Sequence, residues 1–310
     1  MVIEQSENII SEVKKAFTGK DEVIKKVLMA IYAGGHILLE DNPGMGKTTL
    51  ALAFSRALGL SYNRLQFTSD TLPSDIVGYS IFNRQTNRFE YIDGAINCNL
   101  LLADEVNRTS PKTQSALLQA MAENKITVDG KTKGLPTPFT CIATENPFGT
   151  IGTQPLPESQ LDRFIIRLSI GYPSTQAQME ILRSRKFSDP IEKIKPVITA
   201  TDVIEIQNYI SSVKISDDAL RYLINLCEYT RDNEYVELGI SPRGVMALTK
   251  MAKVSAVFNE RTYVIPEDIQ YVFYDVCEHR IVLKPQAKIT GVSAKNVLES
   301  TLNAITPPSV

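Results

Sequence analysis

The sequence predicts an α/β protein in which a parallel sheet lies between helices and a separate all-helical domain follows. An apolar strand pattern at 36–40 leads directly through a glycine-rich turn into a helical pattern at 48–58. Strand signals stop after residue 172, and helical patterns take over. Three further short apolar runs have the composition of buried parallel strands, at 100–103, 139–143 and 164–170.

The elements around these strands can be justified in chain order. From 11 to 33 apolar residues recur at helical spacing with a break near Thr18-Gly19-Lys20, which predicts two short helices. Ser241-Pro242 and Ile265-Pro266 are typical helix starts, because proline suits the first turn. The tail at 305–310 is expected to be extended or frayed. We therefore expect an α/β core over 1–172 and a separate helical domain over 173–310.

Length and charge limit the class of protein. A chain of 310 residues exceeds the usual size of one domain, so two domains that share a cleft are expected. Thirty-three basic and thirty-five acidic residues give a formal charge of −2. This balance provides no overall electrostatic attraction to nucleic acid or to an anionic membrane.

Cysteine usage and the N-terminus indicate a cytoplasmic protein. The N-terminal segment lacks the basic and then apolar layout of a signal peptide. The apolar runs are far shorter than the ~20 residues that span a bilayer, so no membrane insertion is expected. Four cysteines form no CxxC pair and are expected to be reduced and buried, namely Cys98, Cys141, Cys227 and Cys277.

The segment from Asp41 to Thr48 matches a phosphate-binding loop between a strand and a helix. Gly44 and Gly46 allow the backbone N–H groups to turn inward around phosphate oxygens. Lys47 is predicted to contact the β- and γ-phosphates of ATP, and the Thr48 hydroxyl to bind Mg²⁺. The first position of the general pattern is Asp41 and not glycine. The predicted nucleotide-binding residues are Asn42, Pro43, Gly44, Met45, Gly46, Lys47, Thr48 and Thr49.

Polar residues follow two other predicted strands, at the carboxyl edge where open α/β sheets bind ligands. The strand at 100–103 ends in Asp104 and Glu105. Asp104 is predicted to hold Mg²⁺, and Glu105 to polarise the water that attacks the γ-phosphate. Asn146 follows the next predicted strand and is a candidate to hydrogen-bond that water or the γ-phosphate. The alternative is a solvated, purely structural strand end.

These motifs together resemble the MoxR family of AAA+ ATPases. DNPGMGKT, LLLADEVNR, ATENP, LPESQLDRF and SPRG occur in the order and at roughly the spacing of that family. The phrases TSDTLPSDIVG and PKTQSALLQAM are also specific to it, so the resemblance covers nearly the whole chain. It implies an AAA+ core with a helical lid, and it implies that Asp41 is an accepted variant.

The resemblance also implies roles for three further residues. Asn146 corresponds to sensor 1, Arg163 to the arginine finger that acts on a neighbouring subunit, and Arg243 to sensor 2. Because Arg243 follows Ser241-Pro242 at a helix start, we expect it to face the nucleotide across the cleft between the domains. Arg108 is a competing candidate for the trans-acting role. A surface salt bridge is the alternative role for Arg163 and Arg243.

Two insertions are predicted to be β-hairpins. Residues 79–92 alternate around a polar turn, and residues 126–135 contain Asp129-Gly130, a strong two-residue turn signal. By resemblance, such hairpins face a central pore or a partner. The alternative is that they only extend the edge of the sheet.

The resulting expectation is an Mg²⁺-dependent ATPase that assembles into a hexameric ring. The resemblance implies a chaperone-like role in remodelling or maturing a partner protein, such as one with a von Willebrand factor A domain. A nucleic-acid motor is the first alternative, since one hairpin carries Arg84 and Arg88 and the other Lys131 and Lys133. The second alternative is a nucleotide-binding scaffold without turnover.

Overall fold

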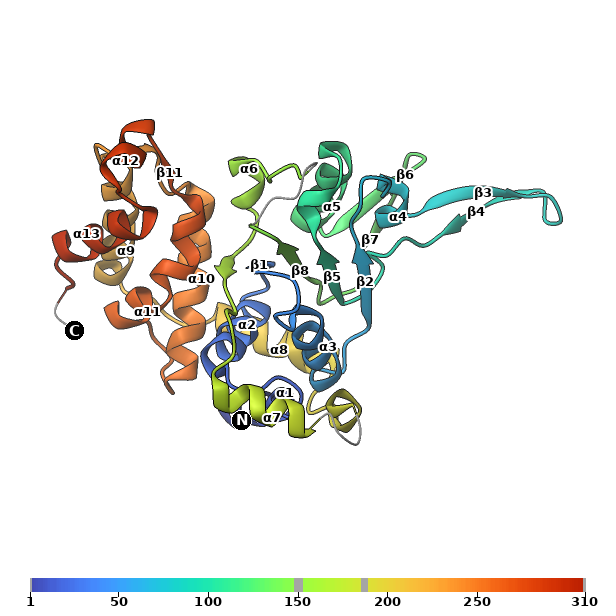
Figure 1. Ribbon diagram of the computed structural model, residues 1–310, viewed down its shortest axis with the longest axis horizontal. Coiled ribbons are helices and arrows are strands. Elements are labelled where there is room, and N and C mark those ends of the chain that lie inside the picture. Colours follow the sequence, from blue (N-terminus) through green and yellow to red (C-terminus); the bar gives the residue numbers. More distant parts are fainter. Residues whose placement is uncertain (1, 148–152, 185–188, 309–310) are drawn as a thin grey trace.

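A computed structural model describes residues 2–147, 153–184 and 189–308 of the chain. Its centre is a five-stranded parallel sheet in the order β2-β5-β8-β1-β9 (Figure 1). The strands are β1 (Ile37–Glu40), β2 (Tyr62–Gln66), β5 (Leu100–Asp104), β8 (Thr140–Glu145) and β9 (Ile166–Leu168). The four predicted strands are confirmed, although β9 is shorter than the apolar run that predicted it.

Strand β2 is the element of the sheet that the sequence pattern did not indicate. It lies at the sheet edge and pairs only with β5 among the described strands. Its residues, YNRLQ, are half-buried or exposed, so they lack the apolar run of a strand that is covered on both faces.

Helices cover both faces of the sheet, and alternate residues of one strand enter two different cores. Leu100 and Leu102 pack with α1 (Val2–Lys14), α2 (Asp21–Tyr32) and α3 (Lys47–Ala57). Leu101 and Ala103 pack with α4 (Pro73–Val77) and α5 (Pro111–Glu123). This alternation is the reason that the strands consist of continuous apolar residues. All four cysteines are free and buried, as predicted.

Both predicted hairpins are present. The first consists of β3 (Tyr79–Asn83) and β4 (Arg88–Ile92), and Figure 1 shows it extending well away from the rest of the molecule. The second consists of β6 (Lys125–Val128) and β7 (Lys131–Gly134). Asp129 and Gly130 at its turn have φ of 49° and 74°, as a two-residue turn with positive φ at both positions requires.

The chain after β9 is mainly helical. The predicted starts at Pro242 and Pro266 are confirmed, and the Ser241 hydroxyl caps its helix by accepting the N–H of Gly244 at 3.0 Å. The described helices after β9 are α7 (Thr175–Ser184), η2 (Pro190–Lys193), α8 (Ala200–Ser211), α9 (Asp217–Arg231), α10 (Pro242–Phe258), α11 (Pro266–Cys277), η3 (Glu278–Arg280), α12 (Pro285–Thr290) and α13 (Ala294–Ala304). Two short helices, η1 (Val106–Arg108) and α6 (Glu158–Leu161), precede β9.

Two details differ from the expectation for this region. A small antiparallel pair, β10 (Val236–Leu238) with β11 (Val282–Leu283), lies among the helices, too short to produce a pattern of alternation. In Figure 1, helices α9 to α13 form one group at the side of the core, whereas α8 lies with α2. Gln207 of α8 donates to the carbonyl of Ile31 of α2 at 2.8 Å. The domain boundary after residue 172 stays a prediction. Within the described residues, no helix combines the length and apolarity of a membrane span.

Candidate functional site

The loop between β1 and α3 depends on two glycines. Gly44 and Gly46 have φ of 85° and 86°, in the left-handed region that glycine adopts without strain. A Cβ on Gly46 would lie 3.1 Å from the ring of Phe17, so a side chain at this position would also crowd that ring. Helix α3 then begins at Lys47, and its N-terminus faces the loop as an anion-binding helix end requires.

The Lys47 side chain is buried beneath this loop. Its ammonium donates to the backbone carbonyl of Asp41 at 2.6 Å and to that of Glu145 at 3.2 Å. Burial lowers the pKa of Lys47, and the nearby carboxylates of Asp41, Asp104 and Glu105 oppose that shift. The ammonium therefore lies where the carboxyl ends of β1 and β8 meet. Its contact with phosphate stays a prediction.

Asp41, the residue that departs from the general motif, has a structural task. Its carboxylate accepts the Ser169 hydroxyl at 2.9 Å and the backbone N–H groups of Ile170 and Gly171 at 2.5 and 3.0 Å. The side chain is buried and points toward the segment that follows β9. An aspartate at this position thus ties the start of the glycine-rich loop to the exit from the sheet.

Asp104 is the last residue of β5, and its buried carboxylate accepts hydrogen bonds from two side chains. Its Oδ1 accepts the Thr144 hydroxyl at 2.7 Å, and its Oδ2 accepts Arg64 Nη2 at 2.7 Å. Arg64 was not predicted from the sequence, because it lies on the edge strand β2 that the pattern did not indicate.

Glu105 follows in a left-handed conformation, with φ of 59°. Its Oε2 accepts Arg108 Nη1 at 2.7 Å and Gln66 Nε2 at 3.0 Å. Arg108, the competing candidate for a trans-acting finger, is therefore engaged with the candidate base of its own subunit. Gln66, like Arg64, is a β2 residue that sequence reasoning missed.

The donor set fits magnesium in chemical type. Mg²⁺ prefers hard oxygen ligands and is held in nucleotide sites by one or two protein oxygens together with phosphates and water. The hydroxyl of Thr48, in the first turn of α3, and the carboxylate of Asp104 are such ligands. No cluster of three or more His, Cys, Asp or Glu occurs in the described part of the chain, so an all-protein metal cage is not present there.

Glu145 and Asn146 lie at the end of β8, next to the Lys47 ammonium. Burial, with a smaller contribution from Glu40, raises the pKa of Glu145 to about 7. Its Oε1 is buried without a hydrogen-bond partner among the described residues. The backbone carbonyl of Asn146 accepts Asn107 Nδ2 at 3.2 Å, which fixes the chain at the candidate sensor.

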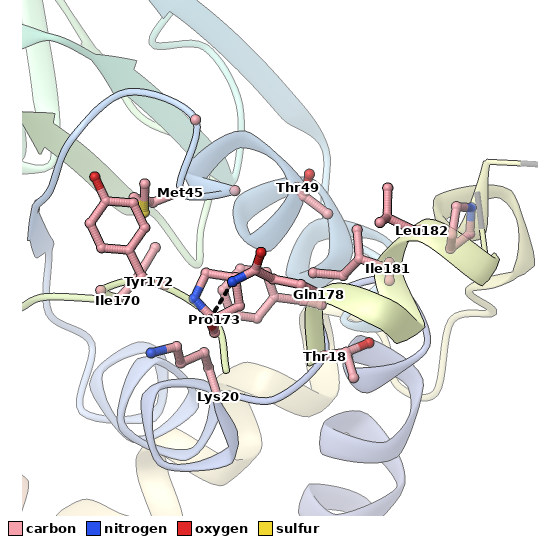
Figure 2. A pocket seen from close by; sticks show the side chains of 16 residues that line it. Thr18, Lys20, Met45, Thr49, Ile170, Tyr172, Pro173, Gln178, Ile181 and Leu182 are labelled. Atoms are coloured by element: carbon pink, nitrogen blue, oxygen red, sulfur yellow. Dashed lines mark hydrogen bonds between the residues drawn. The ribbon is translucent and has the colours of Figure 1, made fainter. Parts of the chain in front are cut away.

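A cavity of about 400 Å³ opens beside the glycine-rich loop (Figure 2). Its walls come from the loop, from the turn between α1 and α2, from the segment after β9, and from α7. Figure 2 shows Met45, Ile170, Tyr172 and Ile181 around it. This size is within the range of small-molecule sites. Sequence reasoning noted the breaks near 18–20 and 171–173 but assigned them only to element boundaries.

The structure places Arg163 at the edge of the sheet opposite the glycine-rich loop. Strands β1 and β9 are parallel, with Ile37 opposite Ile166, and the N–H of Ile165 donates to the carbonyl of His36 at 2.8 Å. Arg163 lies just before this point, whereas the loop follows the other end of β1. Its Nη1 donates to the carbonyl of Leu118 of α5 at 2.6 Å.

Arg243 lies near Arg163 and is not among the described residues that line the cavity. Its contact with nucleotide stays a prediction. Arg243 Nη1 is 4.0 Å from Asp162 Oδ2, and its charge adds to burial in lowering the pKa of Arg163. The cavity, in contrast, is lined by described residues that all precede residue 191. The N-terminus of α10, which carries Arg243, packs on the segment before β9.

Comparisons with known proteins show which family the chain is similar to. A profile described as "ATPase family associated with various cellular activities (AAA)" matches residues 36–166, and one described as "AAA lid domain" matches 228–301. The chain is 44% identical to the uncharacterized protein YeaC of Bacillus subtilis, over 96% of this chain and 93% of the relative. It is 34% identical to the chaperone MoxR1 of Mycobacterium tuberculosis, over 98% and 82%. A crystal structure of a candidate ATPase from Cytophaga hutchinsonii superposes with a TM-score of 0.91 at 36% identity, covering 99% of this chain and 96% of that one.

Proposed function

The chain belongs to the MoxR family of AAA+ ATPases, and from this premise we propose that it hydrolyses ATP with Mg²⁺ to remodel a partner protein. The observation that carries the hydrolytic part is the meeting of Lys47, Asp104 and Glu105 at one sheet edge. Lys47 Nζ lies at the ends of β1 and β8, and both carboxylates leave the neighbouring strand β5 at the same edge.

Each group has a physical task in this proposal. The backbone N–H groups of residues 44–48 and the Lys47 ammonium bind the phosphates, and the cavity beside Tyr172 accepts the base and ribose. Thr48 and Asp104 would hold Mg²⁺, which would supply positive charge against the phosphates. Glu105 accepts the proton of the attacking water, for which its carboxylate must leave Arg108 or share its hydrogen bond. Asn146 orients that water or the γ-phosphate.

The position of the two arginines supports a ring. Arg163 and Arg243 lie at the edge of the sheet opposite their own loop, separated from it by the length of β1, roughly 13 Å for four residues. Neither arginine is among the described residues that line the cavity beside that loop. We therefore propose that both act on the nucleotide of a neighbouring subunit, in a hexamer, where positive charge stabilises the transferring phosphoryl group.

The first hairpin supports a protein as the client. Two-stranded and clear of the core, it exposes apolar side chains on both faces: Tyr79, Ile81, Phe82, Phe89 and Ile92. Phe89 alone is 73% exposed, and it packs edge-on against Phe82. Exposed apolar groups of this kind mark interaction sites for other proteins. A client with a von Willebrand factor A domain is proposed on family grounds.

A nucleic-acid motor is the second candidate, and the charges of the second hairpin weigh against it. Lys133 is paired with Asp93 at 2.7 Å and lies over the ring of Tyr91, so it is partly neutralised. On the first hairpin, the carboxylate of Glu90 in β4 adds a negative charge near the turn and accepts hydrogen bonds from Asn83 and Thr86. Phosphate binding would require several free cations at these tips.

The decisive experiment uses Glu105→Gln, which keeps the shape of the side chain but cannot accept a proton. We expect this variant to bind ATP by calorimetry with an affinity close to that of the wild type, and to hydrolyse it far more slowly. Lys47→Ala should lose tight binding, because water replaces a charge-assisted phosphate contact poorly. Because Glu105→Gln should keep ATP bound, we expect this variant to retain the client protein during affinity capture.

Wild-type turnover in Glu105→Gln would assign the catalytic base to another residue. Stimulation of the wild-type ATPase by DNA, without capture of a protein, would favour the nucleic-acid motor. Tight ATP binding without any turnover by the wild type would favour a scaffold.

A further inference from the structure

One carboxylate joins the segment that carries Arg163 to the helix that carries Arg243. Asp162 directly precedes Arg163, and its carboxylate oxygens accept the hydroxyl of Ser241 at 3.0 and 2.9 Å. Ser241 is the N-cap of α10, two residues before Arg243. The same carboxylate accepts Arg280 Nε at 2.9 Å. Asp162, which precedes β9, therefore contacts two later parts of the chain: the start of α10 and the short helix η3.

The buried side chain of Arg280 binds both the carboxylate and the backbone of the segment that contains Asp162. This side chain is 2% exposed, and its guanidinium donates to the backbone carbonyls of Asp162 at 3.2 Å and of Phe164 at 2.7 Å. A third carbonyl, that of Val276 at the end of α11, also accepts from it. A planar guanidinium has five donors in a fixed arrangement, so it can bond these carbonyls and the Asp162 carboxylate at once, whereas a lysine ammonium has only three donors.

The packing around Arg280 leaves little freedom for α10. A Cβ on Gly244, in the first turn of α10, would lie 2.8 Å from Arg280 Cδ and 2.6 Å from Ile240 Cγ2. The start of α10 is thus in close contact with the buried arginine, and the Ser241 hydrogen bonds fix it from the other side. Rotation of α10 relative to residues 162–164 would break both sets of contacts.

Arg163 and Arg243 are held close together by this arrangement despite their like charges. Arg163 Nη1 is fixed by the carbonyl of Leu118, and Arg243 Nη1 lies 4.0 Å from Asp162. Two nearby guanidinium groups repel each other, and neighbouring carboxylates offset that repulsion. Asp162 is the carboxylate next to Arg243, and the charge of Glu123 acts on Arg163.

We propose that Asp162 and Arg280 are positioning residues for hydrolysis: they hold Arg163 and Arg243 as one preassembled pair, which then meets the nucleotide of the adjoining subunit as a unit. This inference rests on the proposed ATPase function and deepens it. Neither positioning residue needs to touch nucleotide. Their effect is on rate, because a preorganised pair of charges requires no rearrangement as phosphoryl charge develops.

The test begins with Asp162→Asn, measured as assembled rings. We expect kcat to fall about 10- to 100-fold, as small misplacements of catalytic groups do, while ATP affinity stays within about 2-fold of wild type because the binding loop lies at the other sheet edge. The second measurement combines Asp162→Asn with Arg243→Ala. If Asp162 acts through that arginine, the combined loss in kcat falls well short of the product of the single losses.

A matched pair of serines separates positioning from helix capping. Ser241→Gly removes the contact with Asp162, but glycine remains an acceptable N-cap. Ser216→Gly makes the same change at the N-cap of α9, where the hydroxyl accepts only the N–H of Ala219 among its described partners. We expect a loss of kcat in Ser241→Gly, none in Ser216→Gly, and recovery in Ser241→Thr, which keeps the hydroxyl. Melting temperature and sedimentation of each variant show whether fold and ring are intact.

The outcomes distinguish this inference from the proposed function. Wild-type kcat in both Asp162→Asn and Ser241→Gly, or a full product of losses in the double variant, would overturn the positioning role while leaving the ATPase intact. A wild-type protein that hydrolyses no ATP would overturn both. Equal losses in Ser241→Gly and Ser216→Gly would assign the effect to helix capping and also overturn the positioning role.

Discussion

The carboxylate of Asp41 accepts the backbone N–H of Gly171 at 3.0 Å. These two residues stand at the start of the glycine-rich loop and at the exit from the last strand of the sheet. Gly171 is followed by Tyr172, which lines the cavity beside the loop. The departure from the general motif at position 41 therefore links the two walls of the candidate nucleotide site.

Asp41→Ala should destabilise the fold and spare nucleotide binding. The substitution leaves the buried N–H of Ile170 without its acceptor, and an unsatisfied buried donor costs about 1–3 kcal/mol. ATP affinity should change little, because Lys47 contacts the carbonyl of residue 41 and not its side chain. Chemical unfolding and calorimetry measure the two effects. An unchanged free energy of unfolding would show that the Asp41 link contributes nothing.

Arg64→Gln should lower the Mg²⁺ concentration that half-saturates ATP hydrolysis. The Arg64 guanidinium holds one oxygen of Asp104 at 2.7 Å, and a cation there competes with magnesium for the same carboxylate. Because Arg64 is 45% exposed, the expected shift is modest, about 2- to 5-fold. Arg221→Gln, on the exposed face of α9, is the control. A higher Mg²⁺ requirement would instead mean that Arg64 orients Asp104 for the metal.

Glu145→Gln should change the pH dependence of stability. Burial raises the pKa of Glu145 from 4.5 to about 7, so the native state binds its proton more tightly than the unfolded chain. Folding therefore takes up a proton between these values, and the free energy of unfolding falls as pH rises from about 4.5 to 7. The variant avoids this penalty. Its free energy of unfolding should exceed that of wild type by up to about 3 kcal/mol at pH 8 and should differ little from it near pH 4.

Denaturant unfolding at these two pH values tests the prediction, with Glu205→Gln on the exposed face of α8 as the control. A variant whose stability relative to wild type is the same at both pH values would show that the Glu145 carboxyl ionises normally in the fold.

Much of the fold was predictable because buried parallel strands consist of continuous apolar residues and helix starts carry capping residues. Strand β8 and the helix that begins at Pro242 are examples. Strand β2 was not predictable in this way, since its edge position leaves Asn63 and Arg64 partly in solvent. The β10–β11 pair has only two or three residues a strand, too few for any period.

The residues of the candidate site likewise differ in whether the sequence alone could indicate them. Residues that adjoin in the chain, such as Lys47 with its loop and Asp104 with Glu105, were identified from local pattern. Arg64 and the Asp162–Arg280 contact were not, because tertiary packing alone brings them together. The surroundings of Arg243 could not be predicted for the same reason: the helix start at Pro242 was clear in the sequence, but the contact of its N-cap with Asp162 was not.

Mixing two inactive variants should restore ATP hydrolysis, and this follows from the position of Arg163 at the sheet edge away from its own loop. Arg163→Ala should bind ATP but barely hydrolyse it, since an arginine finger contributes on the order of 10³–10⁵ in rate in related phosphoryl transfer. Lys47→Ala keeps the finger but lacks a competent binding site. In a mixed ring, some interfaces pair an intact site with an intact Arg163, so the mixture should recover a fraction of wild-type turnover.

Subunit exchange must first be shown by sizing or crosslinking, because rings that do not exchange cannot complement. Arg243→Ala mixed with Lys47→Ala should behave in the same way, since Arg243 lies with Arg163 and not at its own loop. Mixing Arg163→Ala with Arg243→Ala is the informative control. Both changes affect the same face of a subunit, so an interface formed by either variant lacks one arginine of the pair, and no recovery is expected. Full activity of a monomeric wild-type protein would exclude action on a neighbour, and recovery in the control mixture would show that the two arginines serve different interfaces.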